Sequence, residues 1–286
     1  MKGIVLAAGK GTRMYPMTHP VCKPLIPVYD KPLIYYPLSV LMQAGIREIL
    51  IITPPDEMAP FIKLLGDGNE LGLHISYRVQ KTPKGIADAF MVGKQFIGDD
   101  DVCLALGDNI FYGDTFKDSL QAAAKLESGA TVFGYYMDDP RPFGVVEFDE
   151  NGRAISIEEK PQHPKSNYII PGLYFCDNQA VKIAEQVKPS ARGELEITSV
   201  ISTYMEQGKL RVLPLKSDFT WLDAGNADSL LQSANTIAGI QKNTGHMSAC
   251  LEEIAYNMGF ITKEMLLQRA EELGKTDYSE YLKKID

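Results

Sequence analysis

The segment from Leu6 to Pro16, LAAGKGTRMYP, is the first part of the chain whose residue types and spacing point to chemistry. An apolar run leads into Gly9 and Gly11, and glycine leaves the neighbouring backbone N–H groups free to face the oxygen atoms of an anion. Arg13 follows, and a guanidinium can hold a phosphate with two parallel hydrogen bonds. The pattern indicates a phosphate-binding loop, with Lys23 a short way on as a second candidate cation.

Two common phosphate-binding motifs do not fit this loop. The dinucleotide motif GxGxxG needs a third glycine for close packing of helix on strand, and Met14 occupies that position. The P-loop motif needs a closing GK[ST], and the only such triplet, Gly274-Lys275-Thr276, has Arg269 where the earlier glycine is required. Two interpretations stay open from the loop alone: a loop that wraps a nucleoside triphosphate, and a tight turn with solvated charges.

Two aspartates follow apolar runs elsewhere in the chain. Asp108 comes just after the run VCLAL, and open α/β sheets bind ligands at the carboxyl ends of their strands. Asp223 ends the run FTWL. Carboxylates and phosphates are the oxygen ligands that suit Mg²⁺, although an isolated Asp-Asn pair such as the one at Asp108 is also a common turn or helix cap.

The elements that must position these residues follow from the apolar pattern. Short apolar runs that stop at Gly or Pro predict strands, and longer stretches that end at Gly predict helices. Their alternation before residue 130 predicts a parallel sheet with helices on both faces. The predicted strands cover residues 2–8, 48–53, 74–79 and 102–106, and the predicted helices cover residues 33–44, 55–65 and 86–96.

The pattern changes after residue 130. Asn151-Gly152 is a strong hairpin signal between two apolar runs. From Asn226 onward the sequence is mostly helical. We therefore predict one continuous α/β unit with a β-rich second half and a helical tail. Strands are predicted over residues 131–136, 144–148, 154–158 and 209–215, and helices over residues 178–187 and 195–206.

Composition excludes several classes of protein. A net charge of −8 over 286 residues argues against a nucleic-acid-binding protein, which normally has a basic face. The four cysteines form no CxxC pair, so structural zinc and redox-dithiol sites have little support, and Cys103 and Cys176 are predicted to be buried thiols. No apolar run reaches the ~18 residues that span a bilayer, and no signal-peptide pattern is visible. We predict a cytoplasmic protein without membrane or nucleic-acid partners.

Motifs spread along the chain decide between the open interpretations. Together they resemble the signature of the sugar-1-phosphate nucleotidylyltransferases, in coherent order and over nearly the whole chain. The closest likeness is to members that transfer a thymidylyl group to glucose 1-phosphate. The motifs are residues 6–16, KPLIPVYDKPLIYYPL (23–38), LGDNIFYG (106–113), FGVVEF (143–148), EEKP (158–161), KSNYIIPGLYF (165–175), ARGELEIT (191–198) and WLDAG (221–225).

This resemblance implies a fold and an assembly. The fold would be a Rossmann-like three-layer α/β structure with a mixed, mainly parallel sheet. Residues 1–225 would form a single core, with residues 1–130 binding the nucleotide and residues 131–225 the sugar, and residues 226–286 would be a helical extension packed on it. The resemblance also implies a homotetramer that is inhibited by the downstream sugar nucleotide, dTDP-rhamnose.

The resemblance further implies the reaction of dTTP with α-D-glucose 1-phosphate to give dTDP-glucose and pyrophosphate, with Mg²⁺ as cofactor. The sugar phosphate would attack the α-phosphorus in line, so the protein must align two anions and neutralise charge rather than supply a nucleophile. By resemblance Asp108 and Asp223 hold the metal and Arg13 holds the β- and γ-phosphates. Lys23 meets the α-phosphate or the sugar phosphate, and Lys160 binds the sugar phosphate. Arg13, Lys23, Asp108 and Lys160 form the predicted catalytic set.

The remaining predicted contacts surround the base and the sugar. Gln80 offers a donor and an acceptor to a pyrimidine's imide edge, and Gly85 allows close approach of the backbone, although a polar residue at a strand end is the plainer role for Gln80. Trp221 would wall the sugar site or simply fill the core. The predicted nucleotide set is Leu6, Ala8, Gly9, Gly11, Thr12, Arg13, Gln80, Gly85 and Asp108, and the predicted sugar set is Asn109, Gly144, Glu159, Lys160, Gly172 and Trp221.

Three positions, Ala8, Pro24 and Phe143, differ from the pattern usual in thymidylyltransferases, which carry LAGG, KQLLP and Tyr there. They bear on base and sugar preference, so a UTP-using enzyme or one for another hexose 1-phosphate is the nearest alternative. A non-catalytic sugar-nucleotide-binding regulatory protein is the alternative from another class. Such a protein would have lost the charged set that this chain retains.

Overall fold

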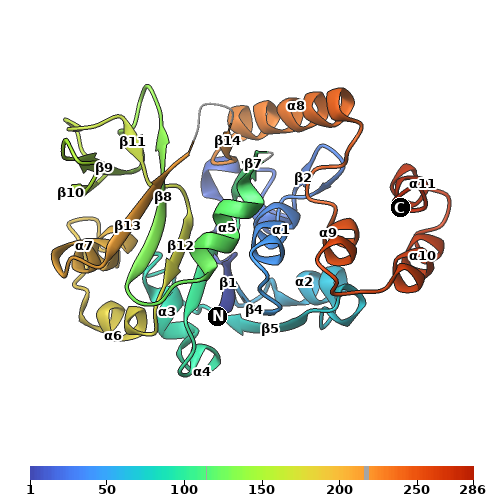
Figure 1. The fold of residues 1–286 in the computed structure, drawn as a ribbon, viewed down its shortest axis with the longest axis horizontal. Helices are drawn as coiled ribbons and strands as arrows, with labels where there is room; N and C mark the ends of the chain where they lie inside the picture. Colours follow the sequence, from blue (N-terminus) through green and yellow to red (C-terminus); the bar gives the residue numbers. More distant parts are fainter. Residues whose placement is uncertain (114, 216–218) are drawn as a thin grey trace.

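A sheet of ten strands forms the centre of the protein in the computed structural model, which describes residues 1–113, 115–215 and 219–286. Its strands are β1 (Lys2–Leu6), β4 (Glu48–Thr53), β5 (His74–Val79), β6 (Val102–Leu106), β8 (Ala130–Tyr136), β9 (Gly144–Phe148), β10 (Ala154–Glu159), β11 (Tyr168–Ile169), β12 (Leu173–Cys176) and β13 (Leu210–Pro214). The order across the sheet is β10-β9-β11-β8-β12-β6-β1-β4-β5, with β13 also paired to β8 (Figure 1).

The first half of the chain builds the parallel part of the sheet, as predicted. β6, β1, β4 and β5 are mutually parallel, and Leu6 is in register with Leu106 on one side and Ile52 on the other. The carboxyl ends of these strands therefore lie at one edge of the sheet. β1, β4 and β6 are mostly continuous apolar runs because helices cover both of their faces.

Helices lie on both faces of the sheet, which confirms the three-layer arrangement. The helices of the first half are α1 (Tyr35–Gln43), α2 (Met58–Leu65), α3 (Asp88–Val92), α4 (Lys94–Ile97) and α5 (Phe116–Ala124), and those of the second half include α6 (Gln179–Gln186) and α7 (Ile197–Glu206). Side chains of α1, α2 and α5 share one hydrophobic core, and those of α3, α4, α6 and α7 share the core on the opposite face.

The single helix predicted over residues 86–96 is wrong, because the structure has two short helices, α3 and α4, divided at Gly93. A Cβ atom at Gly93 would lie 2.7 Å from the Ile4 side chain. The glycine thus lets this segment approach β1 closely, and it also weakens helix formation at that point.

The second half adds antiparallel strands and makes the sheet mixed. β12 is antiparallel to both β6 and β8 and joins the two halves. β9 and β10 form the predicted hairpin, and Asp149 accepts hydrogen bonds from the backbone N–H groups of Asn151 and Arg153 in its turn, at 2.8 and 2.9 Å. The chain therefore continues the same sheet into its β-rich part rather than starting a separate one.

Two small sheets lie apart from the central one. β7 (Asn109–Tyr112) pairs with β14 (Thr220–Asp223), and β2 (Pro27–Val28) pairs with β3 (Lys31–Pro32). The apolar pattern did not predict any of these strands. β7 begins directly after Asp108, and β14 ends at Asp223, opposite Asn109, so both aspartates lie at the same end of this strand pair and their position is set by it.

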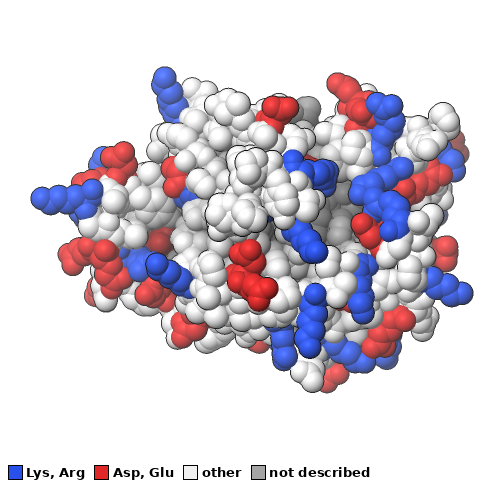
Figure 2. All heavy atoms as spheres, turned by 180° about the vertical axis from the view of Figure 1, so that it is seen from behind, with Lys and Arg blue, Asp and Glu red and all other residues white. Residues whose placement is uncertain are grey.

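The surface carries charged side chains of both signs, and on the face shown in Figure 2 Lys and Arg side chains gather to the right of the centre, beside a hollow. This local clustering coexists with the net charge of −8. Within the described part of the chain, every helix is too short or too polar to cross a membrane.

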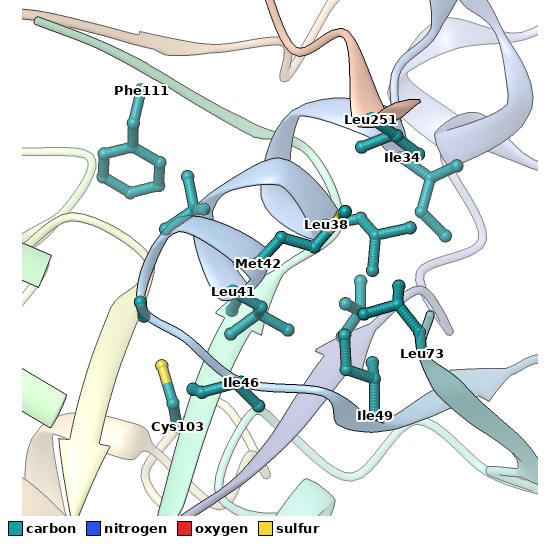
Figure 3. Close-up of a cluster of buried hydrophobic side chains, with 14 of the residues drawn as sticks. Ile34, Leu38, Leu41, Met42, Ile46, Ile49, Leu73, Cys103, Phe111 and Leu251 are labelled. Carbon is teal, nitrogen blue, oxygen red and sulfur yellow. The ribbon is translucent and has the colours of Figure 1, made fainter. Parts of the chain in front are cut away.

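Helix α1 is the centre of the larger hydrophobic core. Leu38, Leu41 and Met42 on its inner face lie over Ile49 of β4 and Cys103 of β6 (Figure 3). Burial of one such side chain stabilises the fold by about 1.5–3 kcal/mol. All four cysteines are buried and free, which confirms the prediction for Cys103 and Cys176.

The C-terminal segment consists of α8 (Ala227–Thr244), α9 (Leu251–Asn257), α10 (Lys263–Glu272) and α11 (Asp277–Leu282). α8 begins at a capping box formed by Asn226 and Ser229, and it packs on β14 and β2. α9 packs on α1, and its Glu252, only 4% exposed, accepts a hydrogen bond of 2.5 Å from the Tyr278 hydroxyl of α11. A buried polar contact thus ties the end of the chain to the core.

We expect Tyr278→Phe to lower the free energy of unfolding by about 1–3 kcal/mol, because the buried Glu252 carboxylate loses a short hydrogen bond. Urea denaturation would measure the change. Tyr136→Phe is the matched control, since the Tyr136 ring is 57% exposed. Equal stability of the two variants would contradict this role for Tyr278.

Candidate active site

The ladder between β7 and β14 brings Asp108 and Asp223 together. Asp223 is opposite Asn109 in antiparallel register, and the backbone N–H of Ala224 donates to the Asp108 carbonyl at 3.2 Å. The two carboxylates therefore come from neighbouring positions of one strand pair. Both line a cleft of about 230 Å³.

Segments far apart in the sequence meet in this cleft. Seven further residues predicted to bind or act lie in its wall: Arg13, Asn109, Gly144, Glu159, Lys160, Gly172 and Trp221. The rest of the wall consists of Ile86, Leu106, Pro142, Phe143, Ile170, Tyr174, Ile197 and Thr198. The cleft thus lies between the carboxyl edge of the parallel strands and the β-rich second half.

Asp108 is held by two neighbours. Lys23, in a short 3₁₀ turn (Lys23–Leu25), places its Nζ 2.5 Å from Asp108 Oδ2, and the Asn109 Nδ2 donates to Oδ1 at 2.9 Å. Lys23 is only 7% exposed, so its buried ammonium group is held beside Asp108. Each carboxylate oxygen has a second lone pair, which leaves Asp108 able to bind a further positive group.

The surroundings of Asp223 disfavour its negative charge. Its burial, followed by the repulsion from Asp108, raises the pKa of Asp223 to about 6. Lys23, Arg13 and Lys160 act on the same carboxylate in the opposite direction and lower its pKa. One acidic pair and three basic side chains therefore face one another across this part of the site, and the two carboxylates could hold a divalent cation.

Asn109 links the aspartates to the cleft wall. It is 3% exposed, and its Oδ1 accepts hydrogen bonds from the Gly172 backbone N–H at 3.0 Å and from Trp221 Nε1 at 2.8 Å. A Cβ atom at Gly172 would lie 2.7 Å from that oxygen, so the close approach needs a glycine. Asn109 was predicted to contact sugar. Both lone pairs of its oxygen are used by the protein and its Nδ2 supports Asp108, so a contact of Asn109 with sugar stays a prediction that depends on its remaining amide N–H.

The opposite wall is built around Glu159. Thr198 Oγ1 donates to its Oε2 at 3.1 Å, while Lys160 Nζ and Arg192 Nη2 each lie 3.7 Å from its Oε1. Burial, then the nearby Glu196 carboxylate, raises the pKa of Glu159. Arg192 was missed from the sequence. The ARGELEIT motif carried a signal for it, because Arg192 is the one basic residue of that motif and stands close to two glutamates, Glu194 and Glu196, that need a cation.

The backbone at Lys160 has an unusual conformation. Its φ is +44°, a left-handed value that costs energy for a residue with a side chain, and its N–H donates to the Phe143 carbonyl at 3.0 Å. Phe143 in turn packs edge-on against Trp221, with ring centroids 5.1 Å apart. The aromatic pair forms an apolar wall beside the Lys160 ammonium group.

The predicted phosphate loop lies at the mouth of the cleft and is largely exposed at Gly9, Thr12 and Arg13. Gly11 has a φ of +59° and is held in place by Thr18, whose hydroxyl donates to the Gly11 carbonyl at 2.7 Å. A Cβ atom at Gly11 would lie 2.8 Å from the Thr18 methyl group, so only glycine fits. The turn is fixed from below while Arg13 stays open to solvent.

The residues predicted to contact the base lie further along the sheet edge. Leu6 and Ala8 are half-buried and buried at the end of β1, whereas Gln80 and Gly85 are outside the wall of the cleft. Gly85 has a φ of +115°, and a Cβ atom there would lie 2.4 Å from the Leu195 carbonyl oxygen. The close backbone approach at Gly85 is therefore made to the segment before α7, a contact that the sequence did not reveal.

Comparisons of the whole chain with known proteins give one consistent set of relatives. The profile of the nucleotidyl transferase family matches residues 2–239. Glucose-1-phosphate thymidylyltransferase of Neisseria gonorrhoeae is 56% identical over 282 residues, covering 99% of this chain and 98% of that protein. The protein of the same name from Xanthomonas campestris is 52% identical over 98% of this chain and 95% of that protein. A crystal structure from Bacillus anthracis, provisionally assigned the same activity and bound to sucrose, is 39% identical, with a TM-score of 0.76 over 82% of this chain and 94% of its own.

We expect Asp223→Asn to stabilise the metal-free protein at pH 8 by about 1–3 kcal/mol, since one pKa unit corresponds to about 1.4 kcal/mol. The folded state holds the Asp223 proton more tightly than the unfolded chain does, because the pKa rises from 3.8 to about 6. Wild-type stability is therefore lost as pH rises between these values, and the loss is complete above pH 6.

Urea unfolding in the presence of a chelator at pH 8 and at pH 4 would measure this difference, which should vanish at the lower pH. Asp138→Asn, at an exposed aspartate, is the control and should change stability little at either pH. A destabilised Asp223→Asn protein at pH 8 would show that the carboxylate is satisfied where it lies.

Proposed function

The chain belongs to the nucleotidyl transferase family, and we propose that it is a glucose-1-phosphate thymidylyltransferase, which converts dTTP and α-D-glucose 1-phosphate into dTDP-glucose and pyrophosphate. One observation carries the proposal for the chemistry. Arg13, Asp108, Lys160 and Asp223 line one cleft, and Lys23 pairs with Asp108 at its floor. The choice of substrates is supported by relatives of this name that are at least half identical over nearly the whole chain.

The reaction needs alignment and charge neutralisation. An oxygen of the sugar phosphate forms a bond to the α-phosphorus of dTTP as the bond from that phosphorus to the β-phosphate oxygen breaks, so pyrophosphate leaves with both electrons. Two anions must approach each other, and fixed positive groups lower the barrier by stabilising the charge that builds up. We assign Arg13 to the β- and γ-phosphates, Lys23 to the α-phosphate or the sugar phosphate, and Lys160 to the sugar phosphate.

The side of the cleft that is built by the second half of the chain suits a hexose. Glu159 keeps one oxygen free of short contacts and can accept hydrogen bonds from sugar hydroxyls, and Gly144 and Gly172 bring backbone into the same wall of the cleft. The Phe143–Trp221 pair gives the apolar wall against which a sugar ring can pack. Asn109 supports this arrangement through its hydrogen bonds to Asp108, Gly172 and Trp221.

We infer that Asp108 and Asp223 hold Mg²⁺. The residues fit such an ion, because two carboxylates come from adjacent positions and the pKa of Asp223 is raised by burial and by the repulsion from Asp108, which a divalent cation would relieve. When bound, Mg²⁺ supplies Lewis-acid polarisation of phosphoryl oxygens. Lys23 and Asn109 keep the Asp108 carboxylate oriented for this role.

Several further features are proposals that rest on likeness to the family. They are a homotetrameric assembly, inhibition by dTDP-rhamnose, a cytoplasmic location and a division of labour among residues 1–130, 131–225 and 226–286. UTP or another hexose 1-phosphate is the alternative substrate. Phe143 bears on the choice of sugar, because its ring packs on Trp221 without the hydroxyl that a tyrosine would offer to the sugar.

A pyrophosphate-release assay over a matrix of nucleoside triphosphates and hexose 1-phosphates tests the function. We expect the highest kcat/KM with dTTP and glucose 1-phosphate. dUTP, which differs from dTTP only by the methyl group on the base, should follow within about 10–200-fold, because one methyl group is worth only about 1–3 kcal/mol. A preference for UTP, or for a different hexose 1-phosphate, would overturn the assignment of substrates. Absence of turnover with every pair would favour the regulatory alternative.

We expect Lys160→Ala to lower kcat/KM for glucose 1-phosphate by about 10–100-fold, because a charge-assisted hydrogen bond contributes about 1.5–3 kcal/mol. The KM for dTTP should change much less. Lys165→Ala is the matched control, since Lys165 is an exposed lysine that pairs with Glu158 at 3.2 Å. Equal losses for both substrates would contradict the placement of Lys160 at the sugar phosphate.

A further inference from the structure

A buried polar pair lies beside the cleft and takes no part in the chemistry described above. The Gln80 side chain is 5% exposed, and its Nε2 donates a hydrogen bond of 2.7 Å to Asp88 Oδ2. Asp88 is 7% exposed and, among the residues that the structure describes, forms no ion pair. A buried carboxylate without a cation is costly, so it needs an explanation that the one side-chain partner of Asp88 within the described ranges is an amide.

The pair belongs to the same layer as the predicted base site. Gln80 follows β5 directly, and its N–H donates to the Thr53 carbonyl at the end of β4. Asp88 begins α3, whose residues share one hydrophobic core with Ala8, Leu6 and Ile86. Gln80 thus lies at the ends of β4 and β5, and Asp88 lies at the start of α3. Both places adjoin the residues predicted to lie beneath the base.

The loop between the two residues leads to the cleft. Ile86 lines the cleft, and the loop is pinned where the Leu195 N–H donates to the Lys84 carbonyl at 2.6 Å and the Ala87 N–H donates to the Leu195 carbonyl at 3.1 Å. From β6, which ends at the cleft, to β5 is three strand spacings, or about 14 Å. That span suits a nucleotide whose phosphates lie in the cleft and whose base lies at Gln80.

Hydrogen-bond chemistry fixes which way the Gln80 amide faces. An ionised carboxylate can only accept hydrogen bonds, so the amide NH₂ must face Asp88 and the amide oxygen Oε1 must face away from it. Rotation of the amide by half a turn would bring two acceptors together in a buried place, where an unmade hydrogen bond is expensive.

We propose that Asp88 is a positioning residue that holds the Gln80 amide with its oxygen toward the base, so that the site accepts thymine or uracil and rejects cytosine. The inference rests on the proposed function for its nucleotide substrate. The ring nitrogen N3 of thymine and uracil carries a hydrogen that Oε1 accepts, whereas N3 of cytosine is itself an acceptor. The C5 methyl group does not enter this discrimination, so the Gln80 amide does not distinguish thymine from uracil.

Asp88→Asn tests the proposal, because an asparagine presents either a donor or an acceptor and no longer fixes the Gln80 amide. The protein would be assayed with Mg²⁺ and glucose 1-phosphate, using dTTP, UTP and dCTP, and the affinity for each triphosphate would be measured by calorimetry. We expect the dTTP:dCTP ratio of kcat/KM, and of binding constants, to fall by about 10-fold or more, with the dTTP:UTP ratio unchanged. A purely structural role would lower all three values alike.

Asp118→Asn is the control, since it removes an aspartate from the first turn of α5 without touching Gln80, and all ratios should stay at their wild-type values. An Asp88→Asn protein with wild-type dTTP:dCTP ratios would overturn the proposal even if turnover with dTTP is high. A shifted binding ratio in a protein that turns over no sugar phosphate would uphold the role of Asp88 and overturn the proposed function instead.

Discussion

The repulsion between Asp108 and Asp223 is the constraint on which the rest of the site depends. Two carboxylates at neighbouring positions of one strand pair repel each other, and this repulsion adds to burial, the larger cause, in raising the pKa of Asp223. The fold compensates with Lys23, buried against Asp108, and with Arg13 and Lys160 at greater range. Such an arrangement is poor for stability and well suited to a cleft that must receive phosphates and a divalent cation, because the charges are already placed before the substrates arrive.

The scaffold keeps this arrangement rigid through buried polar contacts rather than through apolar packing alone. Asn109 joins Asp108, Gly172 and Trp221 with three hydrogen bonds, so the two halves of the chain are fixed to each other at the cleft. β12 adds a second link, since it is antiparallel to both β6 and β8. The apolar core centred on α1 stabilises the fold, and this stabilisation offsets the unfavourable free energy of burying charged groups at the site.

The sequence was sufficient for elements that are apolar and end at a clear signal. β4, β6 and β9 have the predicted bounds, because apolar runs stopped by Pro, Gly or a charged residue leave little choice of length. β5 also has its predicted bounds, with its apolar residues at alternate positions. β7, β14 and β12 were not predicted, since each has four residues inside a motif and is defined by its partner strand rather than by its own pattern.

The same distinction holds for the site. Residues with a strong chemical type, such as Arg13 and Asp223, could be selected from motifs, and the structure places both in the cleft wall. Arg192 and Asp88 could not, because their meaning comes from partners that the fold brings to them. Arg192 lies beside Glu159 across more than thirty residues of sequence, and Asp88 matters only through the amide of Gln80.

The structure separates the charged groups, which lie at the ends of β6, β7 and β14, from the polar contacts at the end of β5. Since these regions share few side chains, base preference can change by substitution near β5 without disturbing the aspartates and cations that the phosphates require.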